Sequence, residues 1–195
     1  RLNHNLVSIT DGRRNDPNDP TFGDGPFVVN HYATTEDPRN LRFDRVIRQI
    51  WGGDVIDFHY QDLAPENPAP NVAVFKTILN DRMGNVTEHW FDVGLRKLRE
   101  RVFTGRAIPT EPTTETENRP TDRLRADDPE FYESRWTYNI DSYVTKETAP
   151  NGTVTESIYA VDLDPNVDPK FRGNLRMRVR RPGTHAPGGD QATIT

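Results

Sequence analysis

The most constraining feature of this chain is the alternation of apolar and polar residues in its C-terminal third. Residues 135–146 (RWTYNIDSYVTK) and 153–163 (TVTESIYAVDL) alternate in this way, and Asn151-Gly152 lies between them. A period of two is typical of a half-buried strand, and Asn-Gly is typical of a type I′ hairpin turn. Residues 174–181 repeat the pattern as a last strand. We therefore expect an antiparallel sheet built from hairpins.

The assumed turn also predicts a register for this hairpin. With Asn151 and Gly152 at its centre, Asp141 lies opposite Asp162, and Asn139 lies opposite Asp164. Like charges that oppose each other directly are destabilising, so this carboxylate cluster needs compensation. The candidates are a bound calcium ion, an arginine from residues 176–180, or solvent, and we rank arginine or solvent above the metal.

Earlier in the chain, short runs rich in β-branched and aromatic residues predict further strands. They are 27–32 (FVVNHY), 54–63 (DVIDFHYQDL), 72–79 (VAVFKTIL) and 86–91 (VTEHWF). The last two runs are separated by NDRMGN, in which Gly84-Asn85 can adopt positive φ. These two runs are expected to form a second hairpin.

Two segments predict helices instead. Residues 38–51 begin after Asp37, a good N-cap, and end before Gly52-Gly53. Their apolar side chains follow helical spacing and should pack on a sheet: Phe43, Val46, Ile47, Ile50 and Trp51. Residues 92–104 place Leu95, Leu98 and Val102 at similar spacing, although Val93, Gly94 and Phe103 also fit a strand.

The composition indicates a small core. Only 33% of the residues are hydrophobic, and the chain has 13 glycines and 16 prolines, so long irregular segments are expected. We predict an α+β, β-rich fold: an extended arm over 1–30, one globular domain over 31–182, and a tail over 183–195. Within the domain, residues 105–130 form a Pro/Thr/Glu-rich excursion. If that excursion is ordered, it must lie on its own domain or on a neighbouring subunit.

Composition also excludes several kinds of chemistry. The absence of cysteine excludes disulfides, thiolate catalysis and thiol-rich metal sites. No apolar run is long enough to cross a bilayer, so no membrane span is expected. The net charge of −5 argues against a general nucleic-acid partner. The 21 arginines against 4 lysines favour contacts with other proteins, although a compositional bias of the genome would give the same ratio.

One pair of side chains suggests acid–base chemistry. Asp57 and His59 lie two apart on one face of a predicted strand, with Asp54 and Asp62 nearby. They could ligate a metal or act in a hydrolase. The five histidines are otherwise scattered and fit no catalytic motif. A solvent-facing strand edge is therefore the preferred interpretation, and we assign no catalytic, cofactor or metal residue.

A second stretch resembles the spacing of calcium ligands. It carries oxygen donors at every second position: Asp162, Asp164, Asn166 and Asp168. Val167 replaces the glycine of a calcium loop, and Gly173 replaces its bidentate glutamate. Because Pro165 and Pro169 flank the central residues, an ordinary Asp-Pro turn is the preferred interpretation.

A third stretch carries a row of arginines, Arg176, Arg178 and Arg180. The row could contact an acidic protein surface or phosphates, or it could protect an exposed sheet edge from aggregation. We weight edge protection and a protein partner about equally, with little weight for nucleic acid. Asn85-Val-Thr and Asn151-Gly-Thr match the glycosylation pattern but lie where turns are expected.

These features favour a non-enzymatic structural subunit of a larger assembly with other protein subunits. A virus or phage particle component (tail, neck or capsid-associated), or another extracellular complex, would fit. The alternative is a secreted or periplasmic module that binds carbohydrate or peptide on a sheet face lined by Trp90, Trp136 and Tyr138. A hydrolase that uses Asp57 and His59 ranks third.

Overall fold

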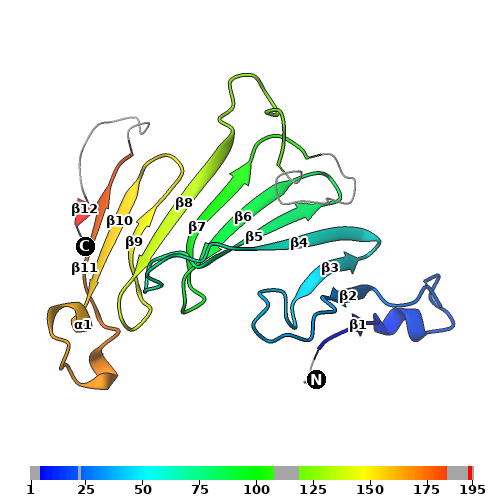
Figure 1. Cartoon of the computed structure of the whole chain (residues 1–195), viewed down its shortest axis with the longest axis horizontal. Helices are drawn as coiled ribbons and strands as arrows, with labels where there is room; N and C mark the ends of the chain where they lie inside the picture. The colour runs from blue at the N-terminus through cyan, green and yellow to red at the C-terminus, as the bar shows by residue number, and fades with distance from the viewer. Residues whose placement is uncertain (1–4, 22, 108–118, 184–192, 195) are drawn as a thin grey trace.

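A computed structural model describes residues 5–21, 23–107, 119–183 and 193–194. They form one antiparallel sheet of twelve strands, in which every strand pairs with the strands next to it in sequence. Figure 1 shows the sheet as an open arch with the two termini at its opposite ends. The expected β-rich antiparallel fold is confirmed. The strands are β1 (Ser8–Ile9), β2 (Val28–Tyr32), β3 (Val46–Trp51), β4 (Asp54–Asp62), β5 (Phe75–Asp81), β6 (Val86–Phe91), β7 (Lys97–Phe103), β8 (Phe131–Tyr138), β9 (Val144–Thr148), β10 (Val154–Tyr159), β11 (Leu175–Arg181) and β12 (Thr193–Ile194).

Four of the hairpins share one turn geometry, over residues 81–85, 92–96, 139–143 and 149–153. In each, the first residue donates its N–H to the carbonyl of the fifth, and the fourth donates to the carbonyl of the first. The fourth residue has positive φ in every case: Gly84 (77°), Leu95 (60°), Ser142 (66°) and Gly152 (80°). This is the three-residue loop that combines a type I turn with a bulge at the left-handed residue.

The shared turn overturns the register predicted for the β9–β10 hairpin. Gly152 alone has positive φ in this turn, so the loop holds three residues, not the two of a type I′ turn. The pairing is shifted by one residue, and Glu156 lies opposite Lys146. The expected strand over 135–146 is in fact two strands, because β8 ends at Tyr138 and β9 begins at Val144. Asp141 therefore lies in a turn and does not oppose Asp162.

Both predicted helices are wrong. Residues 46–51 are strand β3, paired with β2 and β4, and the residues before it form successive turns that end at Asp44, with φ of 56°. None of the predicted apolar stripe is fully buried. Val46, Ile47 and Ile50 are β-branched, and their strand preference outweighs a helical spacing that spans only two turns. Residues 92–104 are likewise a turn followed by β7.

Little helix is present in the described chain. The α-helix α1 (Ala160–Leu163) is a single turn, and short 3₁₀ helices cover Gly12–Asn15 and Pro169–Phe171. Within the described ranges, no helix is long and apolar enough to cross a bilayer. The expectation of one or two helices packed on the sheet is thus replaced by an almost pure sheet.

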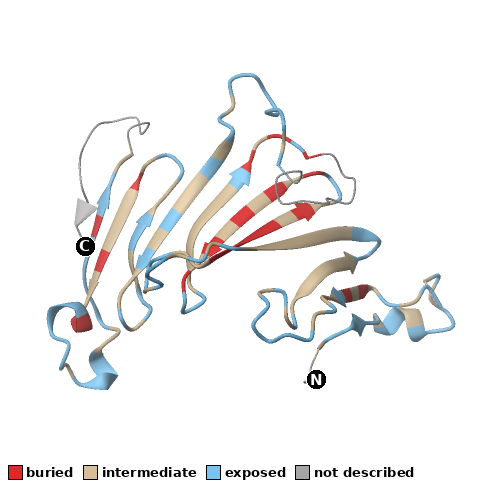
Figure 2. Ribbon diagram, viewed as in Figure 1, coloured by how far each residue is buried: buried red, intermediate tan, exposed pale blue. Residues whose placement is uncertain are grey.

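The hydrophobic core is small and lies on one face of β5–β8. Ile78, Val86, Phe103 and Ala107 form it, and Phe131 packs against them. Figure 2 shows the buried residues concentrated on β5 and β6. The Ala107 N–H donates to the Gly84 carbonyl at 2.8 Å, so the chain folds back over its own sheet directly after β7.

The predicted excursion over 105–130 is described at both ends, whereas residues 108–118 lie outside the described part. Arg119 binds the buried carboxylate of Glu88 at 2.9 Å, and Lys76 binds the same carboxylate at 3.2 Å. The Thr104 N–H donates to the Glu130 carbonyl. The described ends of the excursion therefore lie on their own domain.

The two outermost strands come from the predicted arm and tail. β1 pairs with β2 through two residues, and β12 pairs with β11 through two residues. Because very short edge strands offer few unpaired backbone groups, both edges of the sheet are blunted against uncontrolled strand addition.

Candidate functional site

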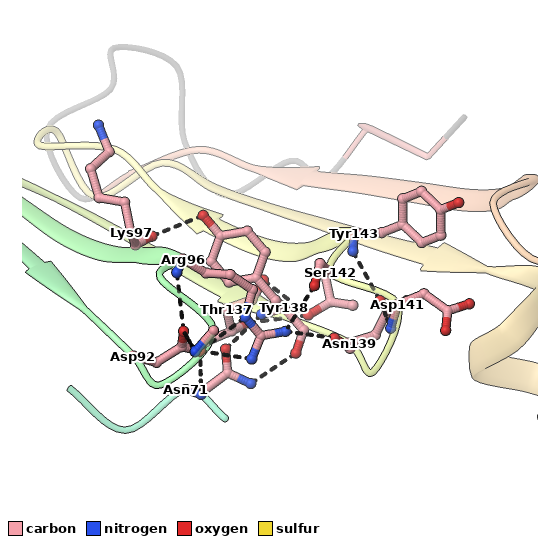
Figure 3. A network of polar contacts seen from close by, with 12 residues as sticks. Asn71, Asp92, Arg96, Lys97, Thr137, Tyr138, Asn139, Asp141, Ser142 and Tyr143 are labelled. Atoms are coloured by element: carbon pink, nitrogen blue, oxygen red, sulfur yellow. Dashed lines mark hydrogen bonds and ion pairs between the residues drawn. The ribbon is translucent and has the colours of Figure 1, made fainter. Parts of the chain in front are cut away.

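A buried ion pair lies where the β6–β7, β8–β9 and β4–β5 loops meet, at one end of the sheet (Figure 3). Arg96 donates to Asp92 Oδ2 from Nη2 at 2.7 Å and from Nε at 2.9 Å. The same carboxylate accepts the backbone N–H groups of Asn71, Gly94 and Arg96. The Asp92 side chain is fully buried, and both of its carboxylate oxygens accept hydrogen bonds from these protein groups.

The ion pair joins three loops that are distant in sequence. Arg96 Nη1 donates to the Asn139 carbonyl at 2.9 Å, which links the β6–β7 turn to the β8–β9 turn. Asn71 reaches from the β4–β5 loop and exchanges two hydrogen bonds of 2.8 Å with the backbone of Tyr138. Breaking a buried pair of this kind leaves an uncompensated charge, so the network should hold these loops firmly.

Electrostatics support this arrangement. Burial alone would raise the pKa of Asp92, but the hydrogen bonds from Arg96 and from the backbone amides outweigh it and hold the pKa below its usual value. The Arg96 guanidinium also lies 5.2 Å from the centre of the Tyr138 ring. Burial raises the pKa of the Tyr138 phenol, which donates to the Lys97 carbonyl at 2.9 Å.

A second ion pair extends the network to the β10–β11 loop. Arg172 binds Asp141 through Nε at 2.5 Å and Nη2 at 2.8 Å, and this hydrogen bonding lowers the pKa of Asp141. Asn139 Nδ2 donates to Asp162 at 2.9 Å. The predicted carboxylate cluster does not form among the described residues. An arginine does compensate Asp141, but it is Arg172 and not a member of the 176–180 row.

Exposed apolar side chains surround this network. We call them the apolar row: Val93, Leu95, Ile140, Leu163 and Phe171. Leu95 is 65% exposed and Ile140 is 84% exposed, and both project from turns that the Asp92–Arg96 pair holds together. Apolar groups in a rigid, exposed setting are typical of an interaction surface. The row was not anticipated from the sequence.

Asp57, one of the two residues considered for acid–base chemistry, forms an ion pair. Its carboxylate binds Arg48 at 2.7 Å, directly across from it on β3. His59 points to the same face of β4, as expected, and lies opposite Ile78. Asp54 binds Arg82 at 2.6 Å, and Asp62 accepts the Ala64 N–H, so neither faces the Asp57–His59 pair as a ligand set. His4 and His185 lie outside the described residues.

The calcium-like stretch consists of local caps. Asp162 accepts the Tyr159 N–H at 2.8 Å, Asp164 accepts the Asn166 N–H at 2.9 Å, and Asp168 accepts the Lys170 N–H at 3.1 Å. Among the residues that the structure describes, no three acidic or histidine side chains are grouped as metal ligands. These bonds are those of Asp turns and helix caps.

The aromatic residues expected to line one sheet face do not share it. They are divided between the two faces: Trp90 lies on one face, and Trp136 and Tyr138 lie on the other. Trp90 lies in a row with Arg99 and Arg135, so it points away from Trp136, the residue after Arg135. Trp90 is 9% exposed and lies under Lys76, Arg99 and Arg101, each within 6 Å of its ring. Only Trp136 and Tyr138 share a face.

The glycosylation-like sequences are both at turns. The Asn85 amide binds Asp81, and the Asn151 side chain accepts the Thr153 N–H.

Comparison with protein families gives no matching family model, and comparison with curated proteins gives no match.

Proposed function

We propose that this protein is a non-enzymatic structural subunit of a larger assembly and that it contacts its neighbours through the apolar row. The hydrophobic core of this open sheet is small, because its buried cluster holds only Ile78, Val86, Phe103 and Ala107 among the described residues. A partner that covers the apolar row would account for an open sheet with so small a core.

The backbone conformation and the exposure of Leu95 are the main support for this proposal. Its φ of 60° places a leucine in the left-handed region, where it costs about 1 to 2 kcal/mol relative to glycine. The equivalent positions of the β5–β6 and β9–β10 turns hold Gly84 and Gly152. A strained leucine that is 65% exposed contributes little to the isolated domain. Its side chain has a clear use only if another surface covers it.

Another copy of the same chain is the simplest partner. The row of one copy can pack against the same row of a second copy about a two-fold axis, so a single surface supplies both halves of the contact. Leucine, isoleucine and phenylalanine side chains together would form the apolar centre of the contact.

The proposal extends to a virus or phage particle, or to another extracellular assembly. The abundance of arginine over lysine supports this extension, because arginine is enriched in protein interfaces.

Hydroxyl-radical footprinting at increasing protein concentration tests the contact surface. We expect Leu95 and Ile140 to become protected as the protein associates. Met83, which is 65% exposed at the opposite end of the sheet, serves as the internal control and should keep its reactivity. Equal reactivity of Leu95 and Ile140 at all concentrations, or protection of Met83 in their place, would contradict the proposed surface.

A further inference from the structure

An open groove crosses β8–β11 on the sheet face that carries Trp136. Its volume is about 490 Å³, within the range of ligand sites. Because directly opposed residues point to the same face, Trp136, Glu147, Thr155 and Arg180 form one row across the four strands. The further lining residues used below are Ser157, Tyr159 and Arg178.

The two arginines of the groove have no carboxylate partner among the described residues. Arg178 makes one long hydrogen bond, from Nε to Ser157 Oγ at 3.4 Å, and in the described chain no acidic side chain binds Arg178 or Arg180. On the opposite face, Arg181 of the same strand binds Glu156. The Arg178 contact engages only Nε, so both terminal nitrogens remain to bind an anionic oxygen pair.

The rest of the groove offers one ring and several hydroxyls. Trp136 is half-buried, and Lys97 Nζ lies 4.6 Å from the centre of its ring. Thr155, Ser157 and Tyr159 bring hydroxyl groups to β10, between Trp136 and the arginines. Tyr159 stacks on Tyr143 with 4.9 Å between ring centres, which fixes its position.

We propose that this groove binds a segment of an acidic oligosaccharide, one that carries carboxylate or sulfate groups. The arginines would bind the anionic group, Trp136 would stack on the apolar face of a sugar ring, and the hydroxyls with Glu147 would bond to sugar hydroxyls. The inference does not depend on the proposed assembly role, because the groove lies on a sheet face and not at the apolar row.

An acidic peptide fits this groove less well. Peptides commonly bind sheets by adding a strand at an edge, where backbone groups are unpaired. The strands β8–β10 are each paired on both sides, and β11 is paired on its outer side at Val179 and Arg180, so most backbone groups beneath the groove are occupied. The ligand must be held by side chains, and hydroxyls beside one aromatic ring suit a sugar.

Isothermal titration calorimetry of the full chain tests this inference with four probes: an oligogalacturonate, a heparin-derived oligosaccharide, a neutral dextran oligosaccharide and a poly-glutamate peptide. We expect one or both acidic oligosaccharides to bind, which also distinguishes carboxylate from sulfate. Dextran and poly-glutamate should not bind. Binding of poly-glutamate with equal affinity, or of neither acidic sugar, would overturn the proposal.

Variants locate the site. The double substitution Arg178→Gln/Arg180→Gln should raise the Kd for the acidic oligosaccharide about tenfold or more. Trp136→Ala should also weaken binding of the oligosaccharide, and the loss should not depend on salt concentration, because stacking is not an ionic contact. Arg176→Gln is the matched control: the residue is exposed on the same strand but does not line the groove. An equal loss in Arg176→Gln would reduce the binding to general attraction of polyanions and overturn the site.

Discussion

Asp92 and Arg96 form a buried ion pair in which the Arg96 Nη2 atom lies 2.7 Å from Asp92 Oδ2. Asp92 is the first residue of a five-residue turn, and Arg96 is the fifth. The other turns of the same geometry that begin with Asp81 and Asn139 also accept the N–H of their fifth residue with the first side chain. Only the 92–96 turn adds a buried guanidinium, so here a common local motif becomes a junction between loops.

The first prediction concerns this junction. Replacing Asp92 with Asn should lower the free energy of unfolding by about 3 to 5 kcal/mol, because Arg96 would remain as a buried, uncompensated charge. Asp81→Asn is the matched control: Asp81 has the same place in its turn but no arginine partner, and this change should cost less than about 1 kcal/mol. Urea denaturation measures both. Equal effects of the two substitutions would show that the ion pair adds nothing beyond the turn.

The second prediction concerns Leu95. Replacing it with Gly should raise the free energy of unfolding of the monomer by about 1 kcal/mol, because glycine adopts positive φ without strain. Thermal unfolding at low protein concentration measures this change. Ile140→Ser, at an exposed position without positive φ, should change stability by less than about 0.5 kcal/mol. A loss of stability in Leu95→Gly would mean that the side chain packs within its own domain.

The third prediction concerns pH. The pKa values of Asp92 and Asp141 are both lowered in the folded protein, so the unfolded state binds more protons as the solution is acidified. Their contribution to stability is present above the unfolded aspartate pKa of about 3.9 and is lost as the pH falls through the folded values. Denaturant midpoints measured from pH 7 to pH 3 should therefore fall at the acid end.

The variant Asp92→Asn provides the control for this pH dependence. Its stability should be lower at pH 7 and should change less between pH 5 and pH 3, because one of the carboxylates whose pKa is lowered no longer titrates. A wild-type protein that becomes more stable on acidification would contradict the assigned directions.

Much of the sheet could be predicted from the sequence, because its strands are marked by β-branched and aromatic residues. The expected runs at 54–63, 86–91 and 174–181 correspond closely to β4, β6 and β11. The helix over 38–51 was wrong because a short apolar run can fit both periods, and pairing with β2 and β4 decided between them. The register was wrong because Asn-Gly serves both two-residue and three-residue turns.

The candidate site could not be predicted in the same way. Asn71, Arg96 and Asn139 meet only because three loops lie together at the same ends of their strands. No local sequence pattern indicates this contact. Part of the signal was nonetheless available: Asp92 and Asn139 each begin a turn, and polar first residues are typical of such turns. The exposure of Leu95 and Ile140 depends on the fold and has no counterpart in the sequence.

We propose that the apolar row joins copies of this chain. Size-exclusion chromatography with light scattering, run over a series of protein concentrations, measures this association. We predict a mass of at least twice 22.3 kDa at the higher concentrations. The double variant Leu95→Ser/Ile140→Ser should return the mass to that of one chain while remaining folded by circular dichroism. A wild-type protein with the mass of a single chain at every concentration would contradict the claim.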